Sequence, residues 1–272
     1  MNPNQALWEK GDFTKIAASM RTSGERLVDQ IGISPDHTVL DLGCGDGTTA
    51  IPAAQRGADV VGVDIARNLL AAGSQRAAAM GLSNCRFEHG DASDLNGVVD
   101  EVFDVTVSVF GAMFAPRPFD VAQEMVRVTR PDGRIVMGNW IPGDLTLVAQ
   151  ILRVSSAYSP PPPEGFVSPM TWGQEEHVTE RFTKAGVSPG GISCTKSTFT
   201  FDYLGAPSDF VSAFRTYYGP TMNAFEAAEA NGRAEELHSE LEDLFISRNI
   251  STDPNVTTIP ATFLLVDVDL NG

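Results

Sequence analysis

The sequence has few cysteines, few positive charges and no long hydrophobic run, and each shortage excludes a class of protein. The three cysteines, Cys44, Cys85 and Cys194, are too widely spaced for a disulfide framework or a zinc site. Nineteen lysines and arginines against 35 aspartates and glutamates give a net charge of −16, which disfavours nucleic acid as a partner. No apolar run approaches the roughly 20 residues that span a bilayer, and the first residues lack a signal-peptide pattern. We therefore expect a cytoplasmic protein that binds no metal, nucleic acid or membrane.

The composition is that of a globular protein. The chain has 272 residues, of which 42% are hydrophobic and 20% charged. That length suits one or two domains with a full core.

Short apolar runs alternate with amphipathic stretches from residue 38 to residue 140. The runs predict strands, and the stretches between them predict helices, for example over residues 48–56 and 66–80. This order predicts an α/β fold whose parallel strands form a doubly wound sheet. The expected strands cover residues 39–42, 60–63, 85–88, 103–109 and 135–140.

The second half of the chain has a different pattern. Residues 195–203 and 262–269 suit two more strands, and the residues between them have helical spacing. If both strands join the same sheet, the helical block is an insertion that forms a lid over the strand ends. The expected segments are an N-terminal helical cap (1–37), a core (38–140), connecting helices with the sixth strand (141–203), a lid for the acceptor (204–256) and the last strand (257–272).

The segment DLGCGDGT, which begins at Asp41, places a glycine-rich turn between the first strand and the first helix. Such a turn lets the backbone approach a nucleotide-like ligand closely. A dinucleotide fingerprint that starts at Gly43 requires its third glycine at residue 48, but that residue is Thr48. Asp41 would be unfavourable beside a pyrophosphate and favourable beside an ammonium group. The glycine spacing disfavours NAD, and Asp41 favours S-adenosylmethionine, which has an α-ammonium and no phosphate.

Two further aspartates end the next two strands. Asp64 follows the second strand where a carboxylate accepts hydrogen bonds from ribose hydroxyls, and this ribose is common to both cofactors. Asp91 follows the third strand, where it could accept a hydrogen bond from an adenine amino group. Taken alone, an aspartate such as Asp91 is more often a turn or cap residue. Together, Asp41, Asp64 and Asp91 at three successive strand ends predict a nucleoside site.

These motifs give the chain a resemblance to a known family. With DLGCGDG as its glycine motif, VGVDIA as its ribose motif and HGDAS as its adenine motif, the region 38–140 resembles class I S-adenosylmethionine-dependent methyltransferases. Other residues are similar to bacterial small-molecule methyltransferase-like proteins of the type 11, ubiquinone–menaquinone-biosynthesis-like group. They are Trp8, Gly11-Asp12, Met113 to Arg117, Asn139-Trp140 and Tyr218 to Ala224.

The resemblance implies a fold and a cofactor site. The fold is a Rossmann-like sheet, mostly parallel, with one antiparallel strand near the C-terminus. Asp41 would face the methionine amine, and Ile65 would lie against the adenine ring. The Ala92 amide would read the adenine edge together with Asp91, and Phe110 would lie beside the methionine portion. The implied cofactor-binding residues are Asp41, Gly43, Cys44, Gly45, Asp64, Ile65, Asp91, Ala92 and Phe110.

The acceptor is less well defined by the sequence. Aromatic and methionine side chains gather where the lid is expected, which favours a small apolar, aromatic or acyl acceptor and O-methylation. The candidate acceptor residues are Met113, Phe114, Trp140 and Tyr218. Methyl transfer from a sulfonium is an in-line displacement that depends mainly on positioning, so a general base is optional. The sequence offers His89, His177, His238, Tyr217 and Tyr218 as candidate bases, and none of them is assigned.

Two alternative functions remain open at this point. A nicotinamide-dependent oxidoreductase would use the same ribose-binding aspartate, but Thr48 and Asp41 disfavour it. A protein that binds S-adenosylmethionine without catalysis would keep the same motifs. The sequence does not indicate the oligomeric state.

Overall fold

The computed structural model describes residues 3–271, which form a seven-stranded sheet with helices. The strand order is β3-β2-β1-β4-β5-β7-β6. The strands are β1 (Thr38–Leu42), β2 (Asp59–Asp64), β3 (Cys85–His89), β4 (Phe103–Val109), β5 (Thr129–Trp140), β6 (Ile192–Leu204) and β7 (Val256–Asp269). Residues 1–2 of the predicted cap and residue 272 of the predicted last segment lie outside the described residues.

The pairing of the strands confirms the predicted fold class. The pairs β3–β2, β2–β1, β1–β4 and β4–β5 are parallel, whereas β7 runs antiparallel to β5. In β1, the four residues from Val39 to Leu42 are all buried, as expected for a central strand covered on both faces. The parallel pairs place the carboxyl ends of β1, β2, β3, β4 and β5 along one edge of the sheet.

The chain divides into two compact units. Unit 1 comprises residues 1–23, 142–166 and 198–262, and unit 2 comprises residues 24–141, 167–197 and 263–272. The predicted core, residues 38–140, lies within unit 2. The predicted cap is divided, because residues up to 23 belong to unit 1 and the rest to unit 2.

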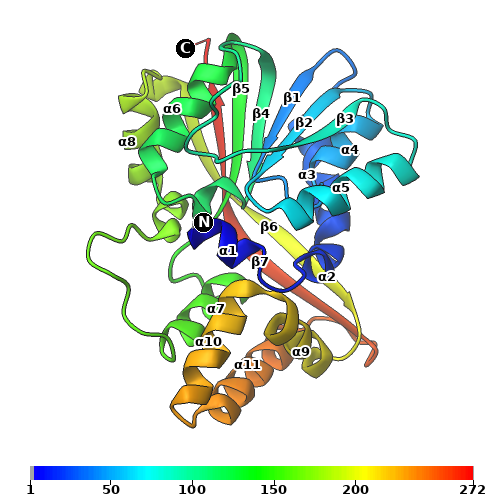
Figure 1. Cartoon of the computed structure of the whole chain (residues 1–272), viewed down its shortest axis with the longest axis vertical. Helices are drawn as coiled ribbons and strands as arrows, with labels where there is room; N and C mark the ends of the chain where they lie inside the picture. The colour runs from blue at the N-terminus through cyan, green and yellow to red at the C-terminus, as the bar shows by residue number, and fades with distance from the viewer. Residues whose placement is uncertain (1–2, 272) are drawn as a thin grey trace. The chain divides into compact units, whose positions relative to one another are not determined.

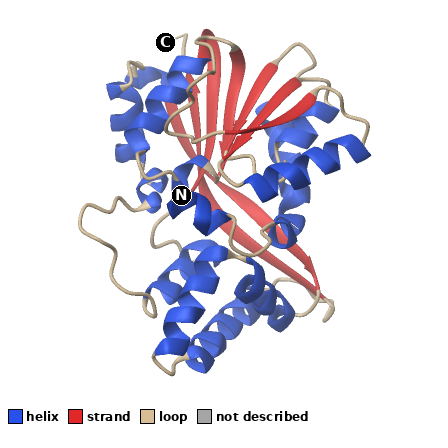
Figure 2. Ribbon diagram, viewed as in Figure 1, coloured by secondary structure: helices blue, strands red, loops and turns tan. Residues whose placement is uncertain are grey.

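Unit 2 is a three-layered α/β structure. Figure 1 shows α4 (Ala50–Gln55) and α5 (Arg67–Ala79) on one face of the sheet, and α6 (Pro118–Val128) and α8 (Glu175–Lys184) on the other. Figure 2 shows the same layers by secondary structure. On the first face, the Phe87 ring lies against Gly73 of α5. On the second, the Thr106 and Thr129 hydroxyls are 2.6 Å apart at the end of α6. The sheet is therefore packed against helices on both of its faces.

Helices dominate unit 1. They are α1 (Pro3–Trp8), α2 (Thr14–Ala17), η1 (Ala18–Met20), α7 (Leu147–Ser156), α9 (Pro207–Tyr217), α10 (Gly219–Ala230) and α11 (Ala234–Arg248), and α3 (Arg21–Ile31) begins there before continuing into unit 2. The core of α9 and α11 contains Phe210, Phe214 and Phe245, whose ring centroids lie 5.1–5.4 Å apart. As predicted, α9, α10 and α11 lie between the last two strands in the chain. Their role as a lid stays a prediction.

The N-terminal segment and α10 pack tightly in unit 1. A side-chain carbon at Gly219 would lie 2.2 Å from the Leu7 carbonyl oxygen, and one at Gly11 would lie 2.7 Å from the Tyr217 carbonyl oxygen. Lys10 Nζ donates to Glu226 at 2.7 Å. The sequence features around Trp8 and Tyr218 therefore belong to one structural cluster, because glycines permit close contact between their backbones.

Two local predictions were wrong for identifiable reasons. We expected β5 to begin at residue 135, but it begins at Thr129, because the turn-like residues Pro131 and Gly133 are tolerated beside an irregular register with β4. From the sequence alone, Thr171 suits the N-cap of a helix that reaches Ala185, but the residue that precedes α8 in the structure is Gln174. The Thr171 hydroxyl instead donates to the Ser168 carbonyl oxygen and accepts from Arg181.

Within residues 3–271, the helices are all too short or too polar to cross a membrane.

The contact between Gly111 and the glycine loop predicts a steric effect on stability. A side-chain carbon at Gly111 would lie 2.1 Å from the Gly43 carbonyl oxygen, so Gly111→Ala should lower the free energy of unfolding by roughly 1–3 kcal/mol. Gly190→Ala is the matched control, because its nearest neighbour, the Ser188 hydroxyl, would be 3.9 Å away. Urea unfolding of both variants tests this, and equal midpoints would contradict the predicted contact.

Candidate cofactor site at the carboxyl ends of the parallel strands

The loop between β1 and α4 is attached to the end of β2 and leaves open space at its centre. The Gly43 and Cys44 amides donate to the Val63 carbonyl oxygen at 2.7 and 3.1 Å. Gly43, Gly45 and Gly47 have φ values of +72°, +54° and +86°, which side chains other than glycine adopt at a cost. Among the described residues, no atom lies within 4 Å of where a side-chain carbon of Gly45 would be. The loop therefore offers exposed backbone to a ligand at Gly45.

Asp41 presents a buried carboxylate beside this loop. Its side chain lies at the end of the central strand β1, and the residue is 2% exposed. The Ala50 amide donates to it, but Oδ2 has no hydrogen-bond partner within residues 3–271. Burial, and to a smaller extent the charge of Asp64, raises the pKa of Asp41 to about 7. A ligand cation at Oδ2 would stabilise the ionised form.

Asp64 connects β2 to the glycine loop. Its Oδ2 accepts a hydrogen bond from the Gly45 amide and its Oδ1 from the Ala66 amide, both at 2.8 Å. Burial raises the pKa of Asp64, although the bonds from Ala66, Gly45 and Ile65 oppose that shift. Each carboxylate oxygen has a second lone pair, so these bonds leave acceptor capacity for hydroxyl groups. Ile65 is half-buried at the same strand end.

Asp91 forms the hydrogen bonds of a turn, which is one of the two roles that the sequence suggested for it. Its Oδ1 accepts hydrogen bonds from the Ser93 amide at 2.9 Å and from the Ser93 hydroxyl at 2.7 Å. Asp91 and Ala92 are both half-buried after β3. The turn fixes the direction of the carboxylate, and the adenine-reading role of Asp91 and Ala92 stays a prediction.

An aromatic stack closes the carboxyl ends of β4 and β5. The Phe110 and Trp140 rings are stacked with centroids 3.6 Å apart, and Phe263 meets Phe110 edge-on at 5.3 Å. Phe110 has a φ of +68°, a strained value for a bulky residue. Gly138 provides the room, because a side-chain carbon there would lie 3.2 Å from the Phe110 ring. Phe110 and Trp140 were predicted site residues. Phe263 was missed, because only the pairing of β5 with β7 brings it there.

Of the other predicted acceptor residues, Met113 and Phe114 belong to unit 2 and Tyr218 belongs to unit 1. Met113 is buried and Phe114 is half-buried in η2 (Ala112–Phe114), directly after Phe110 in unit 2. Tyr218 belongs to unit 1, where its ring lies 5.8 Å from the Phe13 ring and 6.0 Å from the Trp8 ring. Burial raises the pKa of Tyr218. A raised pKa makes this phenol a weaker candidate for a general base.

Sequence reasoning also missed Asp46, which is 1% exposed within the glycine loop. Asp46 Oδ2 lies 3.3 Å from Arg76 Nη1, and the same guanidinium donates to the Asp46 carbonyl oxygen. This ion pair connects the loop to α5. The second acidic residue of DLGCGDG was a visible signal, but its partner lies 30 residues further along the chain.

Burial also raises the pKa of Cys44, so its thiol fills space in the turn rather than acting as a nucleophile. Among residues 3–271, no group of histidine, cysteine or acidic side chains has the arrangement that a metal ion needs.

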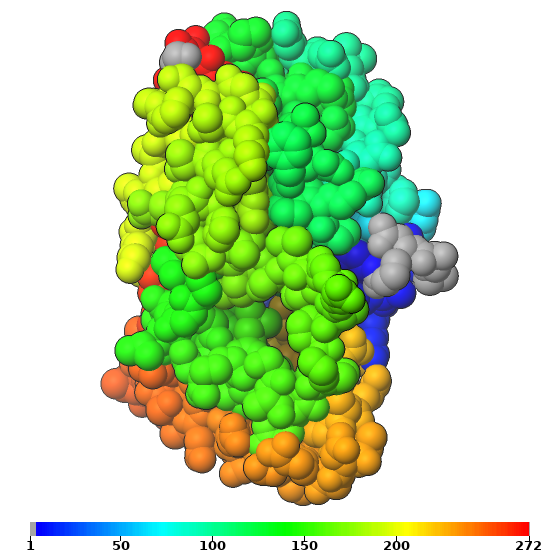
Figure 3. Space-filling model, turned by 90° about the vertical axis from the view of Figure 1, so that its left-hand side faces the viewer, coloured from blue at the N-terminus to red at the C-terminus, as the bar shows by residue number. Residues whose placement is uncertain are grey.

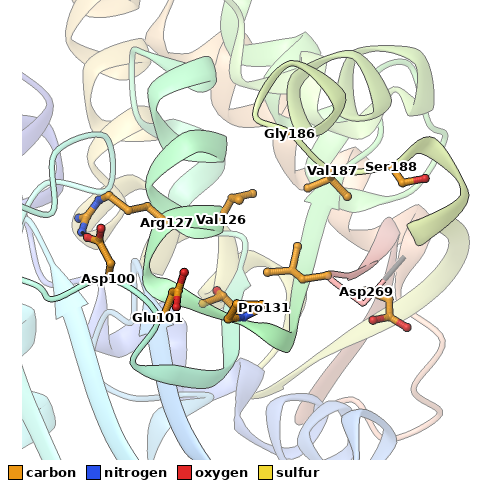
Figure 4. A pocket seen from close by; sticks show the side chains of 11 residues that line it. Asp100, Glu101, Val126, Arg127, Pro131, Gly186, Val187, Ser188 and Asp269 are labelled. Atoms are coloured by element: carbon orange, nitrogen blue, oxygen red, sulfur yellow. Dashed lines mark hydrogen bonds and ion pairs between the residues drawn. The ribbon is translucent and has the colours of Figure 1, made fainter.

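A separate cavity of about 320 Å³ lies at the other end of the sheet (Figure 4). Thr129 at the start of β5 and Asp269 at the end of the antiparallel β7 both line it. Asp100 and Glu101 make its lining acidic, and Arg127 is already bonded to Glu124 and Asp100. It is therefore not part of the site at the carboxyl ends of the parallel strands.

Comparison with known proteins agrees with this geometry. Residues 39–133 match the model of a family described as a methyltransferase domain. An uncharacterized protein of Mycobacterium tuberculosis is 34% identical over 225 residues, which cover 82% of this chain and 80% of the relative. The nocamycin O-methyltransferase of Saccharothrix syringae is 37% identical over 125 residues, 45% of this chain and 44% of that protein.

A solved structure shows the same fold at low sequence identity. The YcgJ protein of Bacillus subtilis superposes with a TM-score of 0.60 at 18% identity, covering 92% of this chain and 99% of that one.

The raised pKa of Asp41 predicts an unusual dependence of stability on pH. The folded protein holds the Asp41 proton up to about pH 7, whereas the unfolded chain releases it near its ordinary pKa of 3.8. The carboxyl therefore contributes less stability as the pH rises between these values, by on the order of 4 kcal/mol in total. Asp41→Asn should accordingly become more stable relative to wild type from pH 4 to pH 8, as measured by urea unfolding.

Asp104→Asn is the control, because the pKa of Asp104 is shifted in the opposite direction to that of Asp41. Partial burial raises the pKa of Asp104, but hydrogen bonds from Thr38 and Arg130 lower it overall. Its carboxylate therefore stabilises the fold above its ordinary pKa, and that contribution is lost as the pH falls. A stability difference between Asp41→Asn and wild type that does not change with pH would show that the Asp41 carboxyl is not held protonated.

Proposed function

The chain belongs to the class I S-adenosylmethionine-dependent methyltransferases, and from that basis we propose that it methylates an oxygen atom of a small, apolar aromatic or acyl acceptor. Its cofactor is S-adenosylmethionine. The observation that carries the cofactor assignment within this chain is Asp41, a buried carboxylate with an unpartnered oxygen beside an open glycine loop. The oxidoreductase alternative loses its basis, because that carboxylate suits an ammonium and not a pyrophosphate.

The residues of unit 2 fit the three parts of this cofactor. Asp41 Oδ2 would pair with the α-ammonium, which lowers the cost of an ionised carboxylate in a buried position. Asp64, directed toward Gly45, would accept hydrogen bonds from the ribose hydroxyls. Asp91 and the Ala92 amide would contact adenine, with Ile65 against the ring, and Gly43, Cys44 and Gly45 would line the methionine portion. Each assignment uses a group that the fold holds at the same sheet edge.

The aromatic stack supports an apolar acceptor. Phe110 and Trp140 are both 5% exposed or less, and the next turn adds the buried Met113. An apolar wall at this strand end favours acceptors that lose little hydration on binding. The methylation of an oxygen atom is supported by the relative from Saccharothrix syringae, whose name describes an O-methyltransferase. Phe114 and Tyr218 remain candidate acceptor residues.

The proposed chemistry needs positioning more than proton transfer. The cofactor would supply a methyl group bonded to a positively charged sulfur, for which a neutral thioether is the leaving group. Asp41 and Asp64 would hold the reactive carbon in line with the acceptor. Phe110 and Trp140 would exclude water from it. A carboxylate acceptor needs no base, whereas a phenol would benefit from one.

Calorimetry with two ligands tests the assignment of Asp41 and Asp64. Asp41→Asn should weaken the binding of S-adenosylhomocysteine by roughly 1–3 kcal/mol, because the charge facing the ammonium is removed. It should leave the affinity for 5′-deoxy-5′-methylthioadenosine unchanged, because that ligand lacks the amino acid portion. Asp64→Ala should weaken both ligands by a similar amount, since both contain the ribose. If Asp41→Asn weakened both ligands equally, Asp41 would not face the ammonium.

An acceptor panel tests the second half of the proposal. Purified protein with S-adenosylmethionine should methylate members of a set of phenols, quinols and fatty acids, detected by release of S-adenosylhomocysteine. Trp140→Ala should lower kcat/KM for the best of them by about thirtyfold, because it removes a buried contact of roughly 2 kcal/mol. Turnover confined to sugars or polar amines would refute the apolar acceptor, and cofactor binding with no turnover of any acceptor would favour the non-catalytic alternative.

A further inference from the structure

Arg181 is a buried arginine that forms no ion pair within residues 3–271. The residue lies in α8 and is 9% exposed. Nη2 donates to the Thr171 hydroxyl at 2.6 Å, but Nη1 is buried and has no partner in the part of the chain that the structure describes. More exposed arginines do have carboxylate partners, such as Arg233 with Glu236 at 2.8 Å. For the buried cation of Arg181, pairing matters most, yet no carboxylate forms an ion pair with it among residues 3–271. The adjacent Glu180 acts on its charge from a longer distance and is itself hydrogen-bonded to Lys184.

Trp172 lies directly against this guanidinium. The Arg181 Cζ atom is 4.6 Å from the centroid of the Trp172 ring, so the two planar groups form a cation–π contact. Trp172 is fully buried, and its Nε1 donor has no acceptor among residues 3–271. A buried indole N–H usually finds a partner. Two donors on adjacent side chains thus lack an acceptor.

Asn139 adds a third unsatisfied group at the end of β5. It is fully buried, and neither Oδ1 nor Nδ2 has a hydrogen-bond partner in the described chain. Asn139 alternates with Trp140 along the strand, so their side chains point to opposite faces of the sheet. The strand register places Trp140 on the face of Phe87, which packs against α5, and Asn139 therefore points to the face that carries α6 and α8. Trp172 and Arg181 come from η3 (Pro169–Gly173) and α8, which cover that same face.

Close packing holds these three residues in one region. A side-chain carbon at Gly173, the residue after Trp172, would lie 2.1 Å from the carbonyl oxygen of Trp140, the residue after Asn139. The segment η3 also packs against η2, which follows Phe110. Figure 3 shows the residues of α8, in yellow-green, beside those of α6, in green, at the surface of this face. The unsatisfied groups therefore lie beneath α8, next to the strand ends that form the candidate site.

We propose that Arg181, Trp172 and Asn139 form a binding site for a carboxylate, which we assign to the methyl acceptor. The guanidinium and the indole offer only N–H donors, and the Asn139 amide can supply another, so the site suits an oxyanion. One guanidinium charge balances one carboxylate charge. A phosphate dianion would bring excess negative charge into a buried region of a protein whose net charge is −16. The assignment to the acceptor rests on the proposed function, whereas the anion site itself does not.

An unpaired buried charge also affects the ligand-free protein. Keeping Arg181 ionised without a counterion costs stability that a bound carboxylate would restore. Arg181→Met keeps an apolar side chain over Trp172 but removes the charge. The variant should therefore melt at the same temperature as ligand-free wild type or above it, and it should gain no stability from carboxylates. A structural arginine would show the opposite, namely a lower melting temperature on substitution.

The test compares benzoate with benzamide, which have nearly the same shape and differ in charge. Both are titrated by calorimetry and by thermal melting into the full-length protein, with and without S-adenosylhomocysteine at constant ionic strength. Wild type should bind benzoate at least tenfold more tightly than benzamide. Formate and inorganic phosphate are titrated in parallel. Formate binding without any gain from the benzoate ring would identify a site for small free anions rather than for the acceptor, and would overturn that assignment.

Arg215→Met is the matched control for Arg181→Met. The Arg215 guanidinium also stacks on an aromatic ring, 4.5 Å from the Phe225 centroid, but it is more exposed and is paired with Glu229. Arg181→Met should abolish the preference for benzoate, and Trp172→Phe, which removes only the N–H donor and part of the ring, should reduce it several-fold. Arg215→Met should retain it. S-adenosylhomocysteine should bind all three variants as it binds wild type.

Several outcomes would overturn the proposal. Equal or absent binding of benzoate and benzamide by wild type would do so, as would a benzoate preference that survives Arg181→Met. A crystal grown with benzoate that shows only a water molecule at Arg181 Nη1 would identify a hydrated structural arginine instead. Failure of wild type to bind S-adenosylhomocysteine would count against the proposed function, while benzoate binding that depends on Arg181 would still establish the anion site.

Discussion

A carboxylate held almost out of contact with water at the end of the central strand determines how the rest of the site is built. Asp41 occupies that position in β1, and its burial raises its pKa to about 7. A buried acid of this kind weakens the fold at neutral pH unless a cation binds to it. The glycine loop, anchored to Val63, leaves open space at Gly45, where we propose that such a cation-bearing ligand binds. The carboxyl group that we propose to bind the cofactor is thus the same group that lowers the stability of the ligand-free fold.

A second buried ionisable group in an unfavourable environment lies on the other face of the sheet. Arg181 is a buried cation with no ion-pair partner among the described residues, and Asp41 is a buried acid with one oxygen that has no hydrogen-bond partner there. Both lie close to the strand ends, where the parallel sheet brings together side chains from distant parts of the sequence. Phe110, with its strained backbone, is a third residue whose local geometry is unfavourable by itself. Unfavourable local features that surrounding packing maintains are typical of binding sites.

The sequence predicted the positions of the acids at the strand ends well because the signals for them are local. Motif spacing alone placed Asp41 and Asp64 at neighbouring strand ends, and the pairing of β1 with β2 confirms that placement. The interpretation of Asp91 remained divided between a turn residue and an adenine ligand, and the structure shows the hydrogen bonds of the turn. The start of β5 was misplaced because Pro131 normally ends a strand, and tertiary pairing with β4 overrides that preference.

By itself the sequence determined the alternation of strands and helices, the glycine turn and the acids that follow the strands, because each depends on residues close together in the chain. Only the tertiary structure decided which side chains lose water and which find partners. Phe263 joins Phe110 through the antiparallel β7, Asp46 pairs with Arg76 across the loop, and Trp172 stacks on Arg181. Burial and charge pairing depend on contacts between segments far apart in the chain, and no local pattern encodes them.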